Sequence, residues 1–300
     1  MKKVLLLRSK KTSENSPKFI EFAAKIQEKL GADIIVDHSS FDRLLFDMGG
    51  QSSTISDVDT GISVSDYDLV IIHVLARSFD EAHAVAAYCK AKNIKCLDNY
   101  PASVTGNKLV MSVCFATHQV PTPRTLYGPV DKLAEIMPEL GEKAIFKDNN
   151  GTKGRLNFLV KTGEELKQTA AQNPDTRFVL QSFIPNSGDM RVITFAGQPI
   201  LAFDRTAVGD SHLNNTSQGG TSTLLQVTDL SPKIKNISIS AAQSVDIDIA
   251  GVDIIVDGNT GLPIVLEVNH TPQMATGAFL PEKITAYSAA IKAWLTTNNS

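Results

Sequence analysis

The sequence has few of the residues that build metal clusters, disulfide frameworks or membrane spans. Its 300 residues include three cysteines, and their positions (Cys89, Cys96 and Cys114) fit no metal-ligand spacing. The odd number also argues against a disulfide framework, so a reducing, cytoplasmic setting is expected. The basic N-terminus MKKVLLLRSK contains an apolar run of only four residues, which is too short for a signal peptide. No apolar run approaches the ~20 residues needed to span a bilayer, so no membrane partner is expected.

An excess of positive charge is missing as well. Lys and Arg number 29 against 32 Asp and Glu, which gives a formal net charge of −3. Proteins that bind nucleic acid present a strongly basic face to the phosphates, so this balance predicts no nucleic-acid partner. Apolar residues make up 42% of the chain and charged residues 20%, which is typical of a globular protein.

Two common nucleotide-binding loops are absent. A dinucleotide-binding fold needs G-x-G-x-x-G after its first strand, but the segment 8–12 that follows the first predicted strand contains no glycine. The Walker A pattern G-x-x-x-x-G-K-[ST] does not occur either. The N-terminal region is therefore interpreted as a scaffold or substrate lobe rather than as the nucleotide site.

The first hundred residues alternate between strand and helix patterns. Apolar runs at 3–7, 33–37, 68–74 and 94–97 predict strands, and helices are predicted to follow Ser16 and Ser78. This alternation is typical of an open parallel α/β sheet. The segment 40–65 is rich in Ser, Asp and Gly and is interpreted as a loop.

Around residue 100 the pattern changes. A helix is predicted from Lys108 to His118, and short strands and hairpins are predicted from residue 143 onward. The second part of the chain therefore has an α+β pattern, which places a domain boundary near residue 100.

One predicted hairpin carries two acids and an amide. Strands at 251–256 and 264–269 flank a segment dense in turn-forming residues. If the turn is centred on Thr260, Asp253 lies opposite Glu267, and alternation along the strand puts Asn269 on the same face. Opposed carboxylates repel each other, and a divalent cation would remove the repulsion. Carboxylate and amide oxygens are hard ligands of the kind that hold Mg²⁺.

The alternative is that this face of the hairpin is solvated and holds no ion. Ile255 and Val265 are expected to lie on the same face as the two acids. Such apolar neighbours favour burial over solvation.

A second polar stretch follows Lys147, which ends a short apolar strand. The segment 148–154 contains two glycines and a lysine, and its backbone N–H groups could be presented to a phosphate. An ordinary turn with a solvated lysine is the alternative. An explanation without a ligand is also open for three further features, which are Arg191, Arg205 and the polar loop 214–221. Together with the acidic hairpin, these features indicate an ATP site framed by cations.

In this order the motifs resemble the ATP-grasp superfamily, and most of all the RimK-type glutamate ligases and their glutathione-synthetase relatives. The resemblance covers residues from about 95 to 295. It implies an ATP-grasp fold preceded by an open parallel α/β lobe. The implied domains are an N-terminal lobe at 1–98, a lid subdomain at 99–183 and a C-terminal subdomain with the metal site at 184–300.

The resemblance also implies a set of site residues. ATP would be held with one or two Mg²⁺, with Mn²⁺ as a substitute, and the hinge 181–184 would take adenine through its backbone. The implied cofactor-binding residues are Lys108, Lys147, Gly151, Thr152, Lys153, Gly154, Gln181, Ser182, Phe183, Ile184 and Asp189. The implied catalytic residues are Arg191, Arg205 and Asn215, and the implied metal ligands are Asp253, Glu267 and Asn269.

The activity that the resemblance implies is ATP-dependent ligation of a carboxylate substrate to an amine substrate through an acyl phosphate. The amine or carboxylate would belong to an amino acid, a peptide or a protein. Two alternatives stay open: a small-molecule ligase of the dipeptide or glutathione type, and a catalytically silent nucleotide-binding protein. A homo-oligomer is compatible with each of them.

Four positions depart from the family pattern. Ser182 stands where the hinge usually has an acid, Gln218 where an arginine is common, and His270 and Gln273 where small residues are usual. The resemblance places most of these positions near the acceptor substrates, so the substrate of the glutamate ligases is not transferred to this chain.

Overall fold

The computed structural model describes residues 1–9, 16–49, 52–74, 78–98, 107–151, 154–206, 221–270 and 272–297. The chain forms two compact units, one of Met1–Ala102 with Thr271–Ser300 and one of Ser103–His270. The C-terminal segment thus belongs to the same unit as the N-terminal lobe. The three-part division with boundaries after residues 98 and 183 stays a prediction.

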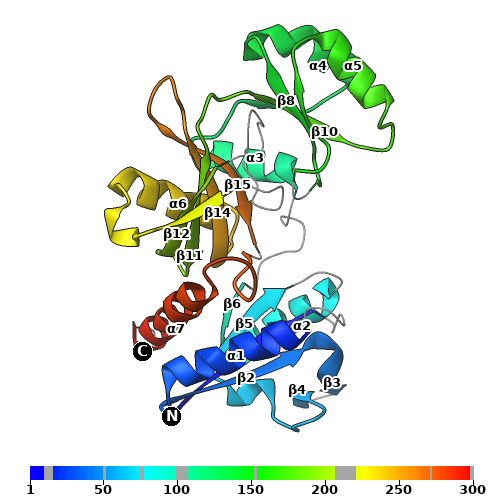
Figure 1. The fold of residues 1–300 in the computed structure, drawn as a ribbon. Coiled ribbons are helices and arrows are strands. Elements are labelled where there is room, and N and C mark those ends of the chain that lie inside the picture. Colours follow the sequence, from blue (N-terminus) through cyan, green and yellow to red (C-terminus); the bar gives the residue numbers. More distant parts are fainter. Residues whose placement is uncertain are drawn as a thin grey trace. The chain divides into compact units, whose positions relative to one another are not determined.

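The first unit is built on a parallel sheet with strand order β2-β1-β5-β6 (Figure 1). Every neighbouring pair in this sheet is parallel, so the predicted open α/β lobe is confirmed. Helix α1 packs against helix α7, the last element of the chain. The bounds are β1 (Lys2–Arg8), α1 (Ser16–Leu30), β2 (Ile34–Ser40), β5 (Leu69–Val74), α2 (Phe79–Ala91), β6 (Lys95–Leu97) and α7 (Leu280–Thr297).

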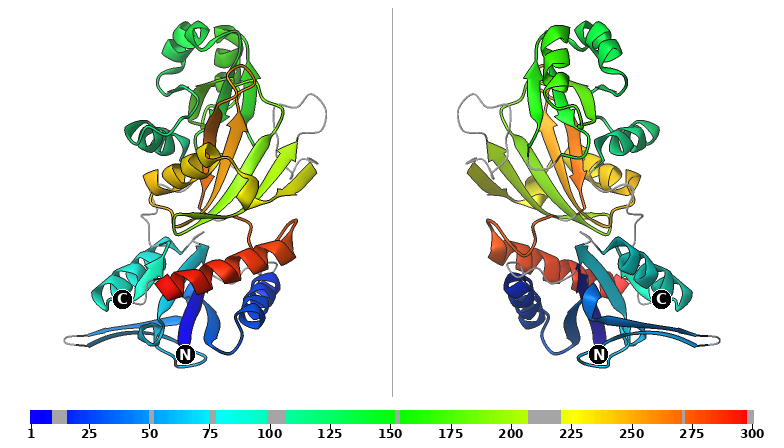
Figure 2. Two further views of the ribbon diagram at one scale, coloured as in Figure 1. Left: turned by 90° about the vertical axis from the view of Figure 1, so that its left-hand side faces the viewer. Right: turned by 90° about the vertical axis from the view of Figure 1, so that its right-hand side faces the viewer.

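The segment 40–65 is not a plain loop, and that interpretation was wrong. It contains an antiparallel ribbon of β3 (Leu44–Gly49) and β4 (Ser52–Asp57), which extends away from the parallel sheet (Figure 2). Phe46 pairs with Ile55, whose side chain is fully buried. The ribbon has only a few apolar residues among many Ser and Asp residues. The alternation of apolar and polar residues that marks a strand is therefore hard to recognise in this segment.

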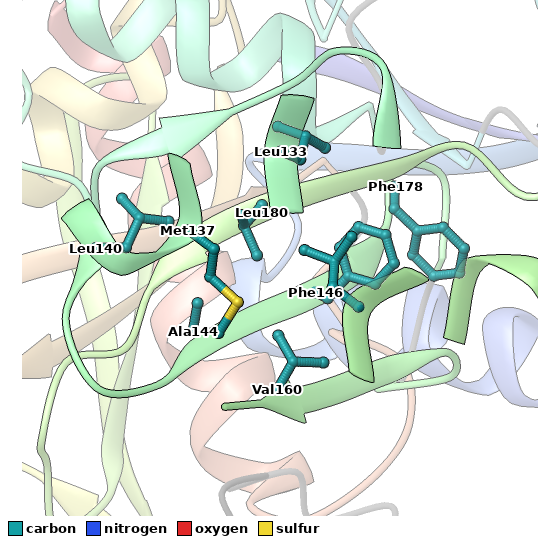
Figure 3. Close-up of a cluster of buried hydrophobic side chains, with 9 residues drawn as sticks. Leu133, Met137, Leu140, Ala144, Phe146, Val160, Phe178 and Leu180 are labelled. Atoms are coloured by element: carbon teal, nitrogen blue, oxygen red, sulfur yellow. The ribbon is translucent and has the colours of Figure 1, made fainter. Parts of the chain in front are cut away.

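The second unit begins with helix α3 and an antiparallel sheet of order β7-β10-β8-β9. One face of this sheet packs against helices, and Figure 3 shows the apolar side chains that fill the interface. Phe146 and Phe178 stack with their ring centroids 4.2 Å apart. The bounds are α3 (Lys108–Thr117), β7 (Thr125–Leu126), α4 (Val130–Ile136), β8 (Ala144–Asp148), β9 (Asn157–Val160), α5 (Gly163–Ala171) and β10 (Phe178–Ser182).

The same unit contains a second sheet of order β13-β12-β11-β14-β15, and helix α6 packs against four of its strands. The pairs in this sheet are antiparallel. The bounds are β11 (Asp189–Phe195), β12 (Gln198–Thr206), β13 (Thr221–Leu225), α6 (Pro232–Ser244), β14 (Ile249–Val256) and β15 (Pro263–Asn269).

Helices α4, α5, α6 and α7 were not predicted, although α5 and α6 begin with recognisable caps. The Thr162 hydroxyl accepts a hydrogen bond from the Glu165 N–H at 3.1 Å. The Ser231 hydroxyl accepts from the Ile234 N–H at 3.3 Å, and Pro232 occupies the first helical position. Both signals are standard N-terminal signatures. Among the helices in the described ranges, none is long and apolar enough to cross a membrane.

A histidine is buried in the core of the first unit. The ring centroid of His73 lies 5.5 Å from Phe19, 5.7 Å from Phe22 and 5.4 Å from Tyr287. Burial lowers the pKa of His73 to about 4. The imidazole is therefore neutral in the folded unit at neutral pH.

This burial predicts an acid-sensitive first unit. Between pH 6.5 and 4 the unfolded chain binds a proton at His73 and the folded chain does not, so stability falls as the pH falls through this window. The loss attributable to His73 is about 3 kcal/mol. In His73→Leu we expect the free energy of unfolding to depend less steeply on pH over this window.

The measurement is urea unfolding followed by the fluorescence of Trp294, the only tryptophan, which lies on α7 in this unit. The matched control is His83→Leu, because His83 is exposed on α2. Equal slopes for His73→Leu and the wild type would contradict the prediction.

Candidate functional site

The hairpin of β14 and β15 brings the predicted acids and amide together. Asp253 pairs with Glu267 across the two strands, so the predicted register at this position is confirmed. The Asn269 side-chain amide donates to a Glu267 oxygen at 3.2 Å and to an Asp253 oxygen at 3.3 Å. Asp253 is buried and Glu267 is half-buried. The solvated-face alternative is thus ruled out for Asp253.

The register beyond this pair differs from the prediction. It shifts between Asp253 and Ile254, so that Ile254 pairs with Val265 and Leu266 is left as the extra residue of β15. Directly paired residues lie on the same face of a sheet. Val265 therefore lies on the face of Ile254, and the expectation that it shares the face of the two acids was wrong. A β-bulge of this kind is not visible in a turn-based register count.

A second pairing places a cation beside the same acid. Arg191 on β11 lies directly opposite Asp253 on β14. Its guanidinium donates from Nε to Oδ1 of Asp253 at 2.6 Å and from Nη2 to Oδ2 at 2.6 Å. This bidentate geometry is the strongest form of a carboxylate–guanidinium pair.

Arg205 on β12 links two acids. It pairs with Asp189 across β11 and β12, and its Nε donates to Oδ1 of Asp189 at 2.5 Å. Its Nη2 lies 3.0 Å from Oδ2 of Asp253. Arg191, Arg205, Asp189 and Asp253 therefore form one continuous ionic network on one face of the sheet.

The network shifts the pKa values of its two carboxyl groups in opposite directions. Burial favours the neutral form of Asp253, but the charges of Arg191 and Arg205 outweigh it and lower the pKa of Asp253 to about 2. Burial and the neighbouring charge of Asp253 raise the pKa of Asp189 to about 6, against the opposing effect of Arg205. Asp253 is thus the carboxylate that stays ionised under all ordinary conditions.

Two buried lysines face the remaining acid. Burial lowers the pKa of Lys147 to about 8, and the charge of Glu267 partly offsets this effect. Burial also lowers the pKa of Lys108, with Glu267 and Asp148 opposing. Two buried amines near one carboxylate give this part of the site more positive groups than negative ones, and their predicted role in holding phosphate stays a prediction.

The loop after β8 is fixed to the start of α3. The side-chain oxygen of Asn149, a buried residue, accepts from the Leu109 N–H at 2.8 Å, and the Asn149 carbonyl accepts from the Lys108 N–H at 3.0 Å. The Lys108 ammonium donates to the Gly151 carbonyl at 2.5 Å. Asn149 thus sets the distance between the loop and Lys108, although it was not singled out from the sequence.

Two glycines of this loop lie in the described part of the chain. A Cβ on Gly151 would lie 2.9 Å from the carbonyl oxygen of Arg155, so no larger residue fits there. Gly154 has a φ of +73°, in the left-handed region. Three of the predicted site residues, Thr152, Lys153 and Asn215, lie outside the described residues, as does the departure at Gln218.

The predicted hinge lies at the end of β10. Gln181 is buried and donates from Nε2 to the Thr125 hydroxyl at 2.7 Å, and the Ser182 N–H donates to the Arg124 carbonyl at 3.0 Å. The Lys143 ammonium lies 4.1 Å from the centroid of the Phe183 ring. The Ile184 carbonyl accepts from the Asn186 side chain at 2.9 Å. The roles predicted for these hinge residues stay predictions.

Two of the family departures lie in described segments. Burial lowers the pKa of His270 to about 4, so this side chain is neutral at physiological pH. The Gln273 carbonyl accepts from the Lys283 ammonium at 2.7 Å.

The donor set fits a hard divalent cation. Within the described ranges no group of three or more His, Cys, Asp or Glu side chains could hold a metal ion. The available donors are the two opposed carboxylates and the amide of Asn269, a small set of oxygen ligands that leaves room for water and phosphate. This is how Mg²⁺ is usually bound with nucleotides.

The fold is that of the ATP-grasp ligases. The structure of the ligase PsnB with a phosphomimetic variant of minimal precursor, Mg and ADP has a TM-score of 0.72 at 15% identity, over 98% of both chains. A D-alanine–D-alanine ligase from Bacillus anthracis has a TM-score of 0.64 at 14% identity, over 99% of this chain and 98% of that one. At these identities the likeness concerns the fold.

Residues 105–287 match the RimK-like ATP-grasp domain, and the chain belongs to this family. A probable alpha-L-glutamate ligase of Mannheimia succiniciproducens is 31% identical over 218 residues, covering 69% of this chain and 70% of that protein. One from Parasynechococcus marenigrum is 30% identical over 178 residues, covering 57% of this chain and 37% of that protein. The match therefore spans little more than a third of the second relative's length. The family resemblance stated from the motifs is confirmed.

The role of Asn149 predicts a local effect of its removal. In Asn149→Ala the Leu109 N–H loses its acceptor, and the start of α3 loses about 1–2 kcal/mol of local stability. Amide exchange of the segment 107–117 should then be about five- to thirtyfold faster. Hydrogen–deuterium exchange measures this directly, with Asn150→Ala, at an exposed neighbouring position, as the matched control. Equal exchange in both variants would show that Asn149 does not anchor the helix.

Proposed function

We propose that the chain is an ATP-dependent ligase that joins a carboxylate to an amine. The observation that carries this proposal is the Asp253–Glu267 pair with Asn269 beside it, on a sheet face where Glu267 also meets two buried lysines. Mg²⁺ held by these three residues would neutralise the phosphates of ATP. Lys108 and Lys147 would hold the phosphate oxygens, and the hinge 181–184 would take the adenine.

The proposed reaction has two steps. An oxygen of the substrate carboxylate attacks the γ-phosphorus of ATP, which breaks the bond to the β-phosphate oxygen and gives an acyl phosphate and ADP. The amine then attacks the acyl carbon, loses a proton, and expels inorganic phosphate as the amide forms. Arg191 would stabilise the charge on the transferring phosphoryl group. Catalysis of this kind rests on positioning and electrostatics and needs no side-chain nucleophile.

The relatives and structural neighbours support a substrate class for this proposal. The relatives are named probable alpha-L-glutamate ligases, and a Chryseobacterium gregarium ligase of the same fold was solved with ADP and a leader and core peptide. We therefore propose that the acceptor is a peptide or protein and that the donor is an amino acid. A small-molecule ligase is the second candidate, because the fold neighbours include D-alanine–D-alanine ligases. The proposal includes a cytoplasmic location.

The test is the release of ADP from Mg²⁺-ATP with a panel of amino acids, beginning with glutamate. Each is supplied alone and in pairs with amino acids, short peptides and unfolded proteins. Turnover that requires both a carboxylate and an amine is the expected result, and the productive pair separates the two candidates. Tight ATP binding without turnover on any pair would contradict the proposal and favour a silent nucleotide binder.

Glu267→Gln tests the metal assignment. The change removes one charged oxygen ligand and keeps the shape of the side chain, so turnover should fall by more than about a hundredfold. The unfolding midpoint should change little, because the variant removes a like charge opposite Asp253 and also removes the carboxylate charge near Lys108 and Lys147, two effects of opposite sign. ADP release and thermal unfolding are compared with those of Glu139→Gln, an exposed acid. Full activity of Glu267→Gln would remove Glu267 from the metal site.

Lys147→Met tests the phosphate site. Replacing the buried ammonium by a thioether of similar length keeps the packing but removes a charge, so the Kd for ATP should rise about ten- to a hundredfold. Isothermal titration calorimetry with Mg²⁺-ATP gives the constant. Lys161→Met, which removes an exposed charge just after β9, is the matched control. An unchanged Kd in Lys147→Met would exclude Lys147 from the site.

A further inference from the structure

Both oxygens of Asp253 are already engaged by side chains of the sheet. Oδ1 accepts from Nε of Arg191 at 2.6 Å. Oδ2 accepts from Nη2 of Arg191 at 2.6 Å, lies 3.0 Å from Nη2 of Arg205, and accepts from the Asn269 amide at 3.3 Å. Oδ2 has three donors for its two lone pairs, so a divalent cation that binds this oxygen must displace at least one of them.

The two arginines differ in how firmly they are held. The Arg205 side chain is only 4% exposed, and it is held between Asp189 on one side and Asp253 on the other. Arg191 is 16% exposed, and among the described residues Asp253 is the carboxylate with which it forms a direct ion pair. Moving Arg205 would leave the buried carboxylate of Asp189 without its cation, which is costly. Moving Arg191 leaves Asp253 with Arg205 and the incoming ion.

We propose that Arg191 is an exchangeable counter-ion of Asp253, and that Asp189 and Arg205 are the fixed pair that positions this carboxylate. Before nucleotide binding, Arg191 occupies the place of the cation. When Mg²⁺ and nucleotide bind together, Asp253 passes to the metal and the released guanidinium passes to a phosphate. This inference rests on the proposed function, because it assumes that Asp253 is a metal ligand.

The exchange has a thermodynamic reason. A metal ion alone that takes Oδ2 from Arg191 breaks a buried bidentate pair and leaves the guanidinium without an anion, so its binding is weakened. A nucleotide brings phosphate oxygens that match the fork of the guanidinium as well as a carboxylate does. Metal and nucleotide therefore favour each other's binding, and each must raise the affinity of the other by the same factor.

The test measures binding of Mn²⁺, used as a spectroscopic substitute for Mg²⁺, by the electron paramagnetic resonance signal of the free ion. Wild type, Arg191→Met and Arg191→Lys are titrated with Mn²⁺ alone and with Mn²⁺ plus ADP. Lys132→Met, which removes the same charge from an exposed site on α4, is the matched control. Circular dichroism of each variant confirms that the fold is kept.

We expect Arg191→Met to bind Mn²⁺ alone roughly ten- to a hundredfold more tightly than wild type, because the competing cation is gone. The factor by which ADP tightens Mn²⁺ binding should shrink in this variant. Arg191→Lys, which keeps the charge but loses the fork, should lie between the two. Lys132→Met should behave as wild type does.

Two negative outcomes are distinct. If wild type binds Mn²⁺ with ADP but Arg191→Met binds Mn²⁺ alone no more tightly than wild type, the exchange is overturned and the proposed metal site stands. If no protein binds Mn²⁺ with or without ADP, the metal assignment fails and the exchange fails with it.

A second measurement separates the two arginines. The Nε–H signals of Arg191 and Arg205 are assigned by their loss in Arg191→Met and Arg205→Lys in ¹⁵N-labelled protein. Addition of Mg²⁺ and ADP should shift the Arg191 signal and leave that of Arg205 nearly unchanged. A large shift of Arg205 with a fixed Arg191 would reverse the two roles and contradict the proposal.

Discussion

The hydrogen-bonded register of β14 with its two neighbours is the constraint on which the site depends. Pairing with β15 places Glu267 opposite Asp253, and pairing with β11 places Arg191 opposite the same residue. A slip of one residue in either pair would turn one of these side chains to the other face of the sheet. The pairing of the strands therefore determines which charged side chains lie next to one another.

The charged groups on this face are costly to bury, and each of them needs a partner of opposite charge. Asp253 is 3% exposed, and the charges of Arg191 and Arg205 keep the pKa of its carboxyl group low against the opposing effect of burial. A buried ionic network of this kind seldom adds stability beyond what apolar residues of similar size would supply. Its presence on one face of an otherwise apolar sheet is therefore better explained by chemistry than by folding. The opposite shifts of the pKa values of Asp189 and Asp253 support the same conclusion.

The local parts of the site could be predicted from the sequence, and the distant ones could not. Asp253 and Glu267 belong to adjacent strands joined by a turn, so period and turn residues alone gave their pairing. The bidentate contact of Arg191 with Asp253 joins positions 62 residues apart, and nothing local says that β11 lies beside β14. The role of Asn149 could not be predicted because it depends on contacts with the start of α3, which is distant in the sequence. Helices α5 and α6 begin at the caps Thr162 and Ser231, but strand patterns dominate the sequence around them, so neither helix was predicted.

The first unit contains two segments that are far apart in the sequence, and this has a consequence for how the chain folds during its synthesis. Its N-terminal segment, with the parallel sheet and α1, leaves the ribosome first, yet α7 packs on α1, and Tyr287 of α7 contacts Phe22. The second unit is continuous in sequence and has all its strands once His270 has emerged. The first unit therefore begins to form before the second unit and is completed after it, and its apolar helix face must stay free of other partners while the second unit folds.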